Sequence, residues 1–428
     1  MKITYITHAC LLIEINKIKI LTDPWLTGPS WGGSLWHYPT HNYTPSNLPI
    51  PDVIFFSHGH DDHFHEQTIS NFPKKWFDAK ILAPKYNVSW WESELQKRFK
   101  NTCFLEHNET LNFNQDIEFQ MFLNINGEFD SSLKIKNNKN SIFLQTDNLM
   151  GEKEAKRISK IDKIDLAFVI PFLTGVFPGF YKWDSDTLIK LANEKIQRSL
   201  NYSSNIVKSL NPKYTVPYAS DLGYLGDKFH INLIHRNNKQ DLIKILKKKK
   251  IKTKPFVLNS GDYIKLTNNK VKINCKNIKK FSEAESLIRF SNQMSEEYRK
   301  YQIKENQVTK PALKKLTTDF TKKLKNNIKN IDKFNFKTSI NIQEGDKNKY
   351  ITINFKNRSI VENKTKDKEA NLTLEIQSNK IRNLLSSKYP MNFLTFHNGG
   401  YTAERKVMNL TNNEKKYWNW INNLDFFI

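Results

Sequence analysis

The chain has 428 residues, which is long for one domain and makes two domains the natural expectation. Its 67 lysine and arginine residues outnumber 43 acidic ones, so the formal net charge is +24. Because lysine, asparagine and isoleucine are abundant along the whole chain and no nucleic-acid-binding motif accompanies them, we predict no nucleic-acid partner. The basic surface still favours an anionic small molecule as substrate.

The cysteines and apolar segments argue against a disulfide-rich or membrane protein. Cys10, Cys103 and Cys275 are odd in number and far apart, so they predict neither a disulfide framework nor a Cys-x-x-Cys metal site. The amino terminus lacks a signal-peptide pattern, and the apolar run at residues 166–177 is too short to cross a bilayer. We therefore predict a soluble, cytoplasmic protein without a transmembrane segment.

The chain begins with three short runs typical of β-strands, at residues 2–7, 10–15 and 17–23. His8 lies on the turn between the first two runs. A histidine at such a turn is either a structural residue or an acid or base that points into a pocket.

A cluster of histidines follows the next predicted strand. The run VIFF is typical of a buried strand, and the sequence SHGHDDHFHE comes directly after it. His58 and His60 are two apart on an extended segment and project to the same side, whereas Asp62 and His63 follow where the chain turns into a short helix. We predict two adjacent metal half-sites, each needing further ligands, rather than a loop of solvated histidines. His65 is predicted to lie at the surface.

Strands and helices alternate after the cluster. The predicted strands cover residues 80–84, 102–106, 117–125, 141–147, 165–172, 213–219 and 256–264. The longest predicted helix covers residues 185–210 and ends before an Asn-Pro pair. This alternation predicts an α/β domain over residues 1–265.

The composition changes beyond residue 265. Residues 266–335 are very basic and predict a helical connection. Residues 336–428 contain three alternating runs that predict an antiparallel sheet, followed by a helix at 378–388. We predict a small α+β domain there. Its pattern is similar to a sterol-carrier-protein-2 module, and covering the active-site mouth, making dimer contacts and binding an apolar ligand all stay open as its role.

The motifs of the first domain resemble a known superfamily. HGHDDH after a buried strand is similar to the metallo-β-lactamase signature, and THAC at residues 7–10 resembles a turn of its phosphodiesterase and lactonase branches. LTDPWLTGP at 21–29, GVFPGFYK at 175–182 and SLNYSSNIVKSLNP at 199–212 are similar to the catalytic part of the CMP-N-acetylneuraminate hydroxylase family. The resemblance covers about residues 1–265.

This resemblance implies an αββα sandwich with two metal ions at one edge of its sheets. It implies that His58 and His60 bind the first ion, that Asp62 and His63 bind the second, and that Asp147 bridges both. A carboxylate between two cations neutralises both at once and so keeps like charges close together.

The resemblance also favours a catalytic role for His8, with Asp62 as the second catalytic group. The nearby loop carries Trp25, Trp31 and Trp36, which either wall a pocket or simply pack.

The sequence departs from the family at two ligand positions. The third histidine of the first metal falls at Asn126, so we predict that Glu128 or Asp130 replaces it. The last histidine of the superfamily is missing as well, and either Asp221 or His230 is predicted in its place. Carboxylates make a site harder, which favours iron or manganese over zinc. We therefore expect two divalent ions, with iron favoured.

Two reaction classes fit such a site. One is hydrolysis of a phosphodiester, ester or lactone by a metal-bound water. The other is oxygenation, the reaction of the hydroxylase family, which acts on a nucleotide-activated sugar and carries a Rieske domain. The sequence has no Cys-x-His and Cys-x-x-His pair, so an oxygenase here would need a separate electron-transfer protein. We favour the oxygenase-like reading, keep hydrolysis as the alternative and place a non-catalytic binding protein last. The sequence leaves an oligomeric state open.

Three basic residues are predicted to bind the anionic substrate. Lys182 follows a glycine-flanked aromatic segment that could close as a lid. Lys195 and Arg198 are three apart on the predicted helix, so they share a face and could clamp a phosphate. The alternative is that both are ordinary solvated helix residues.

Overall fold

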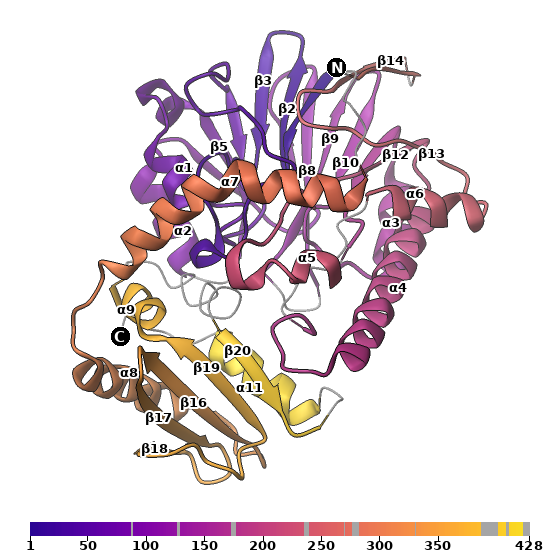
Figure 1. Cartoon of the computed structure of the whole chain (residues 1–428). Helices are drawn as coiled ribbons and strands as arrows, with labels where there is room; N and C mark the ends of the chain where they lie inside the picture. Colours follow the sequence, from indigo (N-terminus) through magenta and orange to yellow (C-terminus); the bar gives the residue numbers. More distant parts are fainter. Residues whose placement is uncertain are drawn as a thin grey trace.

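The computed structural model describes residues 1–428 except 87–88, 126–128, 173–176, 235–238, 269, 276–281, 330, 387–400, 408–410 and 423–428. The described residues form an eight-stranded, a seven-stranded and a five-stranded sheet. In Figure 1 the first two sheets make up the upper part of the molecule and the third lies below them.

The eight-stranded sheet has the order β15-β14-β1-β2-β3-β4-β5-β6. Its strands from β3 to β6 run parallel to one another, and the other neighbours are antiparallel. The strands are β1 (Lys2–Thr7), β2 (Cys10–Ile15), β3 (Ile18–Thr22), β4 (Val53–Phe55), β5 (Lys80–Pro84), β6 (Thr102–Leu105), β14 (Tyr263–Thr267) and β15 (Lys270–Asn274).

The seven-stranded sheet has the order β13-β12-β11-β10-β9-β8-β7 and is parallel from β10 to β13. Its strands are β7 (Thr110–Asn112), β8 (Ile117–Leu123), β9 (Ser131–Asn137), β10 (Ser141–Leu144), β11 (Leu166–Val169), β12 (Tyr214–Pro217) and β13 (Lys254–Pro255).

Several helices accompany these two sheets in the described part of the chain. The helices are α1 (Glu66–Ser70), α2 (Ser89–Arg98), α3 (Glu152–Ile161), α4 (Ser185–Leu210), α5 (Ile231–Ile234) and α6 (Lys239–Lys248), with short 3-10 helices η1 (Trp31–Gly33), η2 (Lys74–Asp78) and η3 (Gly226–Lys228). One apolar core joins the inner faces of both sheets, a second joins the first sheet to α1 and α2, and a third joins the second sheet to α3, α4 and α6. Because both faces of these strands are buried, their sequences are nearly continuous apolar runs. The layers are therefore helix, sheet, sheet, helix, as expected.

Helix α4 has the bounds that the sequence predicts, because both of its ends carry capping residues. The Asp184 side chain accepts a hydrogen bond from the backbone N–H of Thr187 at the first turn. At the other end Asn211 adopts a left-handed conformation that satisfies a terminal carbonyl before Pro212.

The remaining described residues form a five-stranded sheet with four helices. The sheet order is β18-β17-β16-β19-β20. The elements are α7 (Glu283–Asn306), α8 (Leu313–Ile328), β16 (Lys337–Glu344), β17 (Lys347–Asn354), β18 (Ser359–Asn363), β19 (Leu372–Gln377), α9 (Ser378–Ser386), β20 (Tyr401–Arg405) and α11 (Asn412–Asn422). No helix in the described part of the chain is long and apolar enough to cross a membrane.

Two expectations for this region were wrong in detail. The sheet is mixed rather than antiparallel, because β16 and β19 pair in parallel. The predicted helical connection begins with a strand, since β15 pairs with β14 as a hairpin at the edge of the first sheet. The sterol-carrier-protein-2 similarity and the domain boundaries stay predictions.

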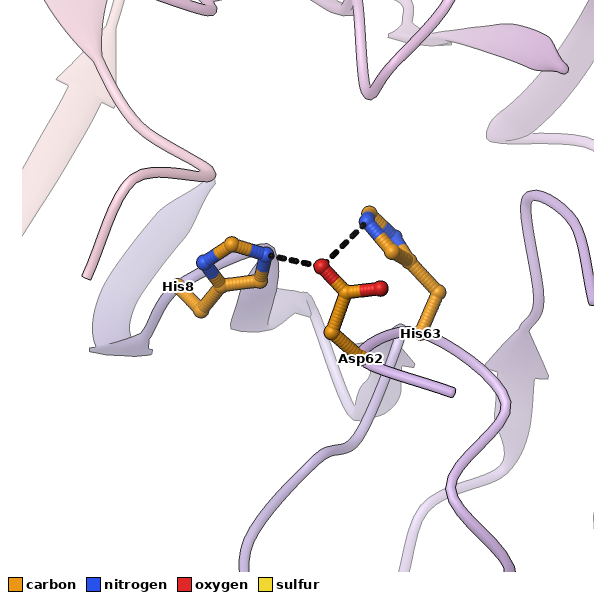
Figure 2. Close-up of side chains that lie close together, drawn as sticks. All are labelled: His8, Asp62 and His63. Atoms are coloured by element: carbon orange, nitrogen blue, oxygen red, sulfur yellow. Dashed lines mark ion pairs between the residues drawn. The ribbon is translucent and has the colours of Figure 1, made fainter. Parts of the chain in front are cut away.

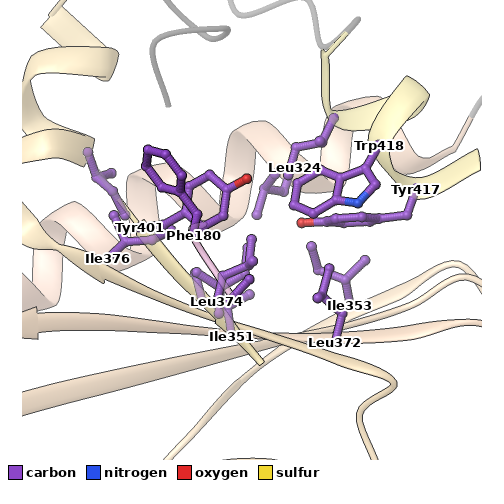
Figure 3. Close-up of a cluster of buried hydrophobic side chains, with 14 of the residues drawn as sticks. Phe180, Leu324, Ile351, Ile353, Leu372, Leu374, Ile376, Tyr401, Tyr417 and Trp418 are labelled. Atoms are coloured by element: carbon purple, nitrogen blue, oxygen red, sulfur yellow. The ribbon is translucent and has the colours of Figure 1, made fainter. Parts of the chain in front are cut away.

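One apolar cluster connects this region with the loop after β11. Phe180 packs on Tyr401, with 5.8 Å between their ring centroids, above side chains of the five-stranded sheet (Figure 3). The backbone of the same loop pairs with β20, because the Ala403 N–H donates to the Phe180 carbonyl at 2.8 Å and the Ala403 carbonyl accepts from the Lys182 N–H at 2.8 Å. The metal-site half of the molecule and the third sheet therefore share one core.

Shortening Phe180 to alanine should lower the free energy of unfolding by about 3–5 kcal/mol, because the ring is buried and leaves a cavity between the two regions. The measurement is the shift of the denaturant midpoint. The control is Ile189→Ala on α4, whose side chain is 57% exposed and whose loss should change the free energy by about 0.5 kcal/mol at most. Equal midpoints for both variants would contradict the shared core.

Candidate metal centre

The predicted metal-binding residues follow strand ends that meet at one edge of the two sheets. The histidine-rich segment begins two residues after β4, and Asp147 follows β10. His8 lies between β1 and β2, and Asp130 immediately precedes β9, which is antiparallel to β10. Loops at one edge of a layered α/β fold commonly carry function because the strands behind them hold them rigidly.

Three groups of side chains in the described residues have donor atoms within 4.8 Å of one another. Each group has two imidazoles and one carboxylate. The groups are His8 with Asp62 and His63, His58 with His60 and Asp130, and His58 with His63 and Asp147. Because the groups share members, they form one continuous cluster that can hold two cations side by side.

The first half of the cluster is built on the pair that the spacing predicts to face one way. The rings of His58 and His60 lie 4.3 Å apart between centroids, and Nε2 of His58 lies 3.5 Å from Oδ1 of Asp130. Asp130 therefore stands where a replacement for the missing third histidine is expected. Asn126 and Glu128 lie outside the described residues.

The second half centres on the carboxylate of Asp62. Its Oδ2 lies 3.2 Å from Nε2 of His8 and 3.9 Å from Nε2 of His63, and Figure 2 shows both imidazoles turned toward it. Nε2 of His63 also lies 3.4 Å from Oδ1 of Asp147. The structure thus brings His8 and Asp147, which are far apart in the sequence, to the HGHDDH motif.

A buried carboxylate outside the motif fixes the orientation of the histidines. Oδ2 of Asp23 lies 3.0 Å from Nδ1 of His63 and accepts a hydrogen bond from the Ser57 hydroxyl at 2.7 Å. The same hydroxyl lies 2.9 Å from Nδ1 of His58. Both imidazoles are therefore held by Nδ1 and present Nε2 to the cluster, as histidine ligands of metals commonly do. Sequence reasoning missed Asp23, although its place at the end of β3, before a proline, was a usable signal.

The surroundings of the Nε2 atoms indicate whether the cluster suits metal ions. Nε2 of His58 and Nε2 of His63 are buried and have no hydrogen-bond partner in the described structure. A buried polar atom without a partner costs free energy. Divalent ions coordinated by these nitrogens would remove that cost, so the residues present fit a metal centre.

Burial and charge set the protonation of the cluster. Burial lowers the pKa of His58 and of His60, which favours the neutral imidazole that a metal needs. Burial also acts to lower the pKa of His63, but the carboxylates of Asp147, Asp23 and Asp62 outweigh it and raise that pKa. Burial acts to raise the pKa of Asp62, yet His63 and His8 lower it well below its ordinary value. Asp62 is therefore held in the ionised form that a cation binds.

The two candidates for the last ligand lie elsewhere. Asp221 forms an ion pair with Lys239, with 2.6 Å between Oδ1 and Nζ, and its other oxygen accepts from the backbone N–H of His8 at 3.3 Å. His230 is exposed, and its Nδ1 lies 3.0 Å from the Asp227 carbonyl oxygen. Neither belongs to the three groups of the described residues. Asp221 instead supports the turn that carries His8.

The three predicted substrate-binding residues differ in their contacts and burial. Lys182 pairs with Glu375 of β19 at 2.8 Å. Lys195 is buried, and its ammonium donates to the Phe177 carbonyl at 2.9 Å, whereas Arg198 is exposed and lines a surface hollow of about 420 Å³. Burial, with a contribution from Arg198, lowers the pKa of Lys195 to about 7. Lys195 and Arg198 differ in burial although they are three apart on α4, and their joint binding of a phosphate stays a prediction.

Two further aromatic residues take defined places. His65 is buried rather than at the surface, because its side chain accepts a hydrogen bond from the Thr68 N–H and caps α1. Trp31 lies against the metal cluster, with 5.1 Å between its ring centroid and that of His60. Its indole N–H donates to Oδ1 of Asp62 at 2.8 Å, so this part of the aromatic loop walls the site.

Comparison with known proteins places the first part of the chain in a superfamily. Residues 2–150 match the model of the beta-lactamase superfamily domain. This domain, with its helix-sheet-sheet-helix layers, is a metallo-β-lactamase fold. The fold implies divalent metal ions.

The more specific likeness is to cytidine monophosphate-N-acetylneuraminic acid hydroxylases. The chain is 25% identical to the Danio rerio protein over 276 residues, which are 62% of this chain and 46% of that protein. It is 25% identical to the Xenopus laevis protein over 229 residues, 51% of this chain and 38% of that protein. The chain thus spans less than half the length of these relatives.

Two solved structures with a similar arrangement carry the name of a hydrolase. An isothiocyanate hydrolase from Delia radicum gut bacteria is 15% identical with a TM-score of 0.41, and the match covers 63% of this chain and all of that one. A metallo hydrolase from Ignicoccus hospitalis is 14% identical with a TM-score of 0.40, over 61% of this chain and 96% of that one.

Replacing His58 and His60 together by alanine should remove metal from the centre while the protein stays folded, because both residues follow β4 rather than belong to it. Elemental analysis of the purified variant measures the metal, and circular dichroism checks the fold. His107→Ala, which changes a histidine away from the cluster, is the control. A double variant with full metal content would exclude these ligands.

Changing Asp23 to asparagine should weaken metal binding by about 10–100-fold, because the carboxylate that orients His63 is lost while the size of the side chain is kept. Competition with a chromophoric chelator measures the affinity. Asp116→Asn removes an exposed carboxylate that also accepts hydrogen bonds and should leave the affinity unchanged. Equal affinity of the Asp23 variant and the native protein would contradict the orienting role.

Proposed function

We propose that the chain is a two-metal, oxygenase-like enzyme that acts on an anionic small molecule such as a nucleotide-activated sugar. The observation that carries the proposal is the donor set of the cluster. The group of His58, His60 and Asp130 has two imidazoles and one carboxylate. Two histidines with one carboxylate and open positions are the ligand set typical of non-heme iron oxygenases.

Bound iron would supply the capacity to activate dioxygen. The residues of the chain would hold the ions and control protons around them. His58 and His60, both favoured in the neutral form, offer nitrogen ligands, and Asp130 offsets part of the positive charge. Asp62 stays ionised as a carboxylate ligand, and His8, whose Nε2 lies 3.2 Å from its Oδ2, is the side chain placed to take or return a proton at the centre.

The proposed substrate class rests on two observations. The relatives with 25% identity are named for hydroxylation of cytidine monophosphate-N-acetylneuraminic acid. The chain itself carries a net charge of +24, which favours association with a phosphate-bearing molecule. In the proposed hydroxylation, the substrate, dioxygen, two electrons and two protons give the hydroxylated substrate and one water molecule.

The electrons for this reaction would come from a separate electron-transfer protein. All three cysteines of the chain are free and differ in burial, with Cys10 buried, Cys103 half-buried and Cys275 exposed. They lie on or beside three different strands, β2, β6 and β15, so they do not assemble an iron–sulfur cluster.

Metal-dependent hydrolysis of a phosphodiester, ester or lactone is the second candidate. The pair of His8 and Asp62 favours it, because the two side chains are buried at the cluster with 3.2 Å between Nε2 and Oδ2. Such a pair can orient a water molecule and take its proton, and a metal ion lowers the pKa of bound water. Hydrolysis requires no electron donor.

Anaerobically prepared protein should contain two iron ions per chain. After chemical reduction and addition of ¹⁸O-labelled dioxygen with cytidine monophosphate-N-acetylneuraminic acid, mass spectrometry should show one ¹⁸O atom in the product. The His58→Ala, His60→Ala variant is the control for adventitious oxidation.

Two zinc ions, together with label that enters a product only from ¹⁸O-labelled water, would reject oxygenation and favour hydrolysis. For the hydrolytic arm a panel of phosphodiesters, esters and lactones serves as substrates.

A further inference from the structure

The turn Trp31–Gly33 lies between the metal cluster and helices of the C-terminal half. Its three residues have positive φ angles of 53°, 60° and 85°. This conformation is unfavourable for the tryptophan, so surrounding contacts must hold it. A Cβ added at Gly33 would lie 2.1 Å from the ring of Tyr301 in α7, which shows how closely that helix packs on the turn.

On the side of the cluster the turn fixes one oxygen of Asp62. The Trp31 indole donates to Oδ1 at 2.8 Å, while Oδ2 faces His8 and His63. An indole N–H is a hydrogen-bond donor only and cannot bind a cation. Because this contact occupies Oδ1 of Asp62, Oδ2 is the oxygen that remains available to a metal ion. The backbone N–H of Trp31 also donates to Oδ2 of the neighbouring Asp61 at 2.6 Å. The tryptophan is therefore attached to the motif at two points.

On the opposite side a lysine of α9 holds the turn. The Lys380 ammonium donates to the Gly32 carbonyl oxygen at 2.5 Å and forms an ion pair with Glu305 of α7. Glu305 in turn accepts hydrogen bonds from the Tyr301 hydroxyl at 2.6 Å and from the Asn383 amide at 3.1 Å. The ion pair of Lys380 and Glu305 is mostly buried, and Glu305 accepts further hydrogen bonds. The ion pair therefore holds Lys380 in one place.

These contacts form a continuous path from α9 to the cluster. We propose that Lys380 positions Asp62 for metal binding through the Trp31–Gly33 turn, with Trp31 as the residue that makes the contact. The proposal rests on the metal centre of the proposed function and is independent of whether the reaction is oxygenation or hydrolysis. It gives the C-terminal half a role in completing the site, because a change at α9 alters how tightly one ion is held.

The test compares two variants of the full chain, Trp31→Phe and Lys380→Met, with the native protein. Metal-free protein is titrated anaerobically with ferrous ion, and each ion's affinity is taken from the binding isotherm. Trp31→Phe keeps a ring against His60 and loses the N–H, so the affinity for one ion should fall by about 10-fold or more. Lys380→Met should weaken the same ion by a smaller factor and leave the other ion unchanged.

Matched controls lie in the same C-terminal half. Trp420→Phe removes an indole N–H that donates to the Asn327 carbonyl oxygen. Lys337→Met removes an ammonium that pairs with Glu369 and is buried to a similar degree as Lys380, with 25% against 21% of the side chain exposed. Both controls should bind two ions like the native protein, and thermal unfolding of the metal-free proteins shows whether a variant is folded.

Native affinity for both ions in Lys380→Met would overturn the proposal while the metal centre stands. Equal weakening of both ions, or the same weakening in the controls, would also overturn it, because that result indicates general loosening. If Trp31→Phe does not fold, the Lys380 variant decides. A native protein that binds fewer than two ions would instead refute the proposed function itself, and the proposal with it.

Discussion

Buried imidazole nitrogens without partners are the constraint on which the rest of the structure depends. Nε2 of His58 and of His63 point into a cluster that contains carboxylates but no hydrogen-bond donor for them among the described residues. Their Nδ1 atoms are already engaged by Ser57 and Asp23, so the rings cannot turn to find other partners. A folded protein tolerates this arrangement when cations complete it. The strand ends, the buried carboxylates and the flanking aromatic loop all serve to hold these nitrogens in place.

The third sheet packs directly on the part of the molecule that carries the metal cluster. Its core contains Trp31 from the loop at the metal cluster and Phe180 from the loop after β11. Figure 3 shows Phe180 among side chains of the third sheet, next to Tyr401. The loop at the cluster and the loop after β11 are therefore packed on residues that come more than one hundred positions later in the chain.

Part of the fold and of the metal cluster was predictable from local sequence patterns. The spacing of His58, His60, Asp62 and His63 sufficed to predict that these side chains lie in one cluster, and the caps of α4 sufficed for its bounds, because both depend on residues close in the sequence. The parallel pairing of β16 with β19 was not predictable, because alternation of apolar residues is the same for either direction. The burial of Lys195 was missed because helical spacing says which residues are neighbours and not which face is covered. The contact between Trp31 and Asp62 requires the tertiary fold.

Anomalous diffraction from crystals of the metal-loaded protein tests the central claim most directly. We predict two metal peaks at the cluster, one bound by His58, His60 and Asp130 and the other by Asp62 and His63, with Asp147 between them. Ligand distances should be about 2.0–2.2 Å, as for nitrogen and carboxylate ligands of such ions. A single peak, or peaks elsewhere with Nε2 of these histidines still lacking a partner, would contradict the account.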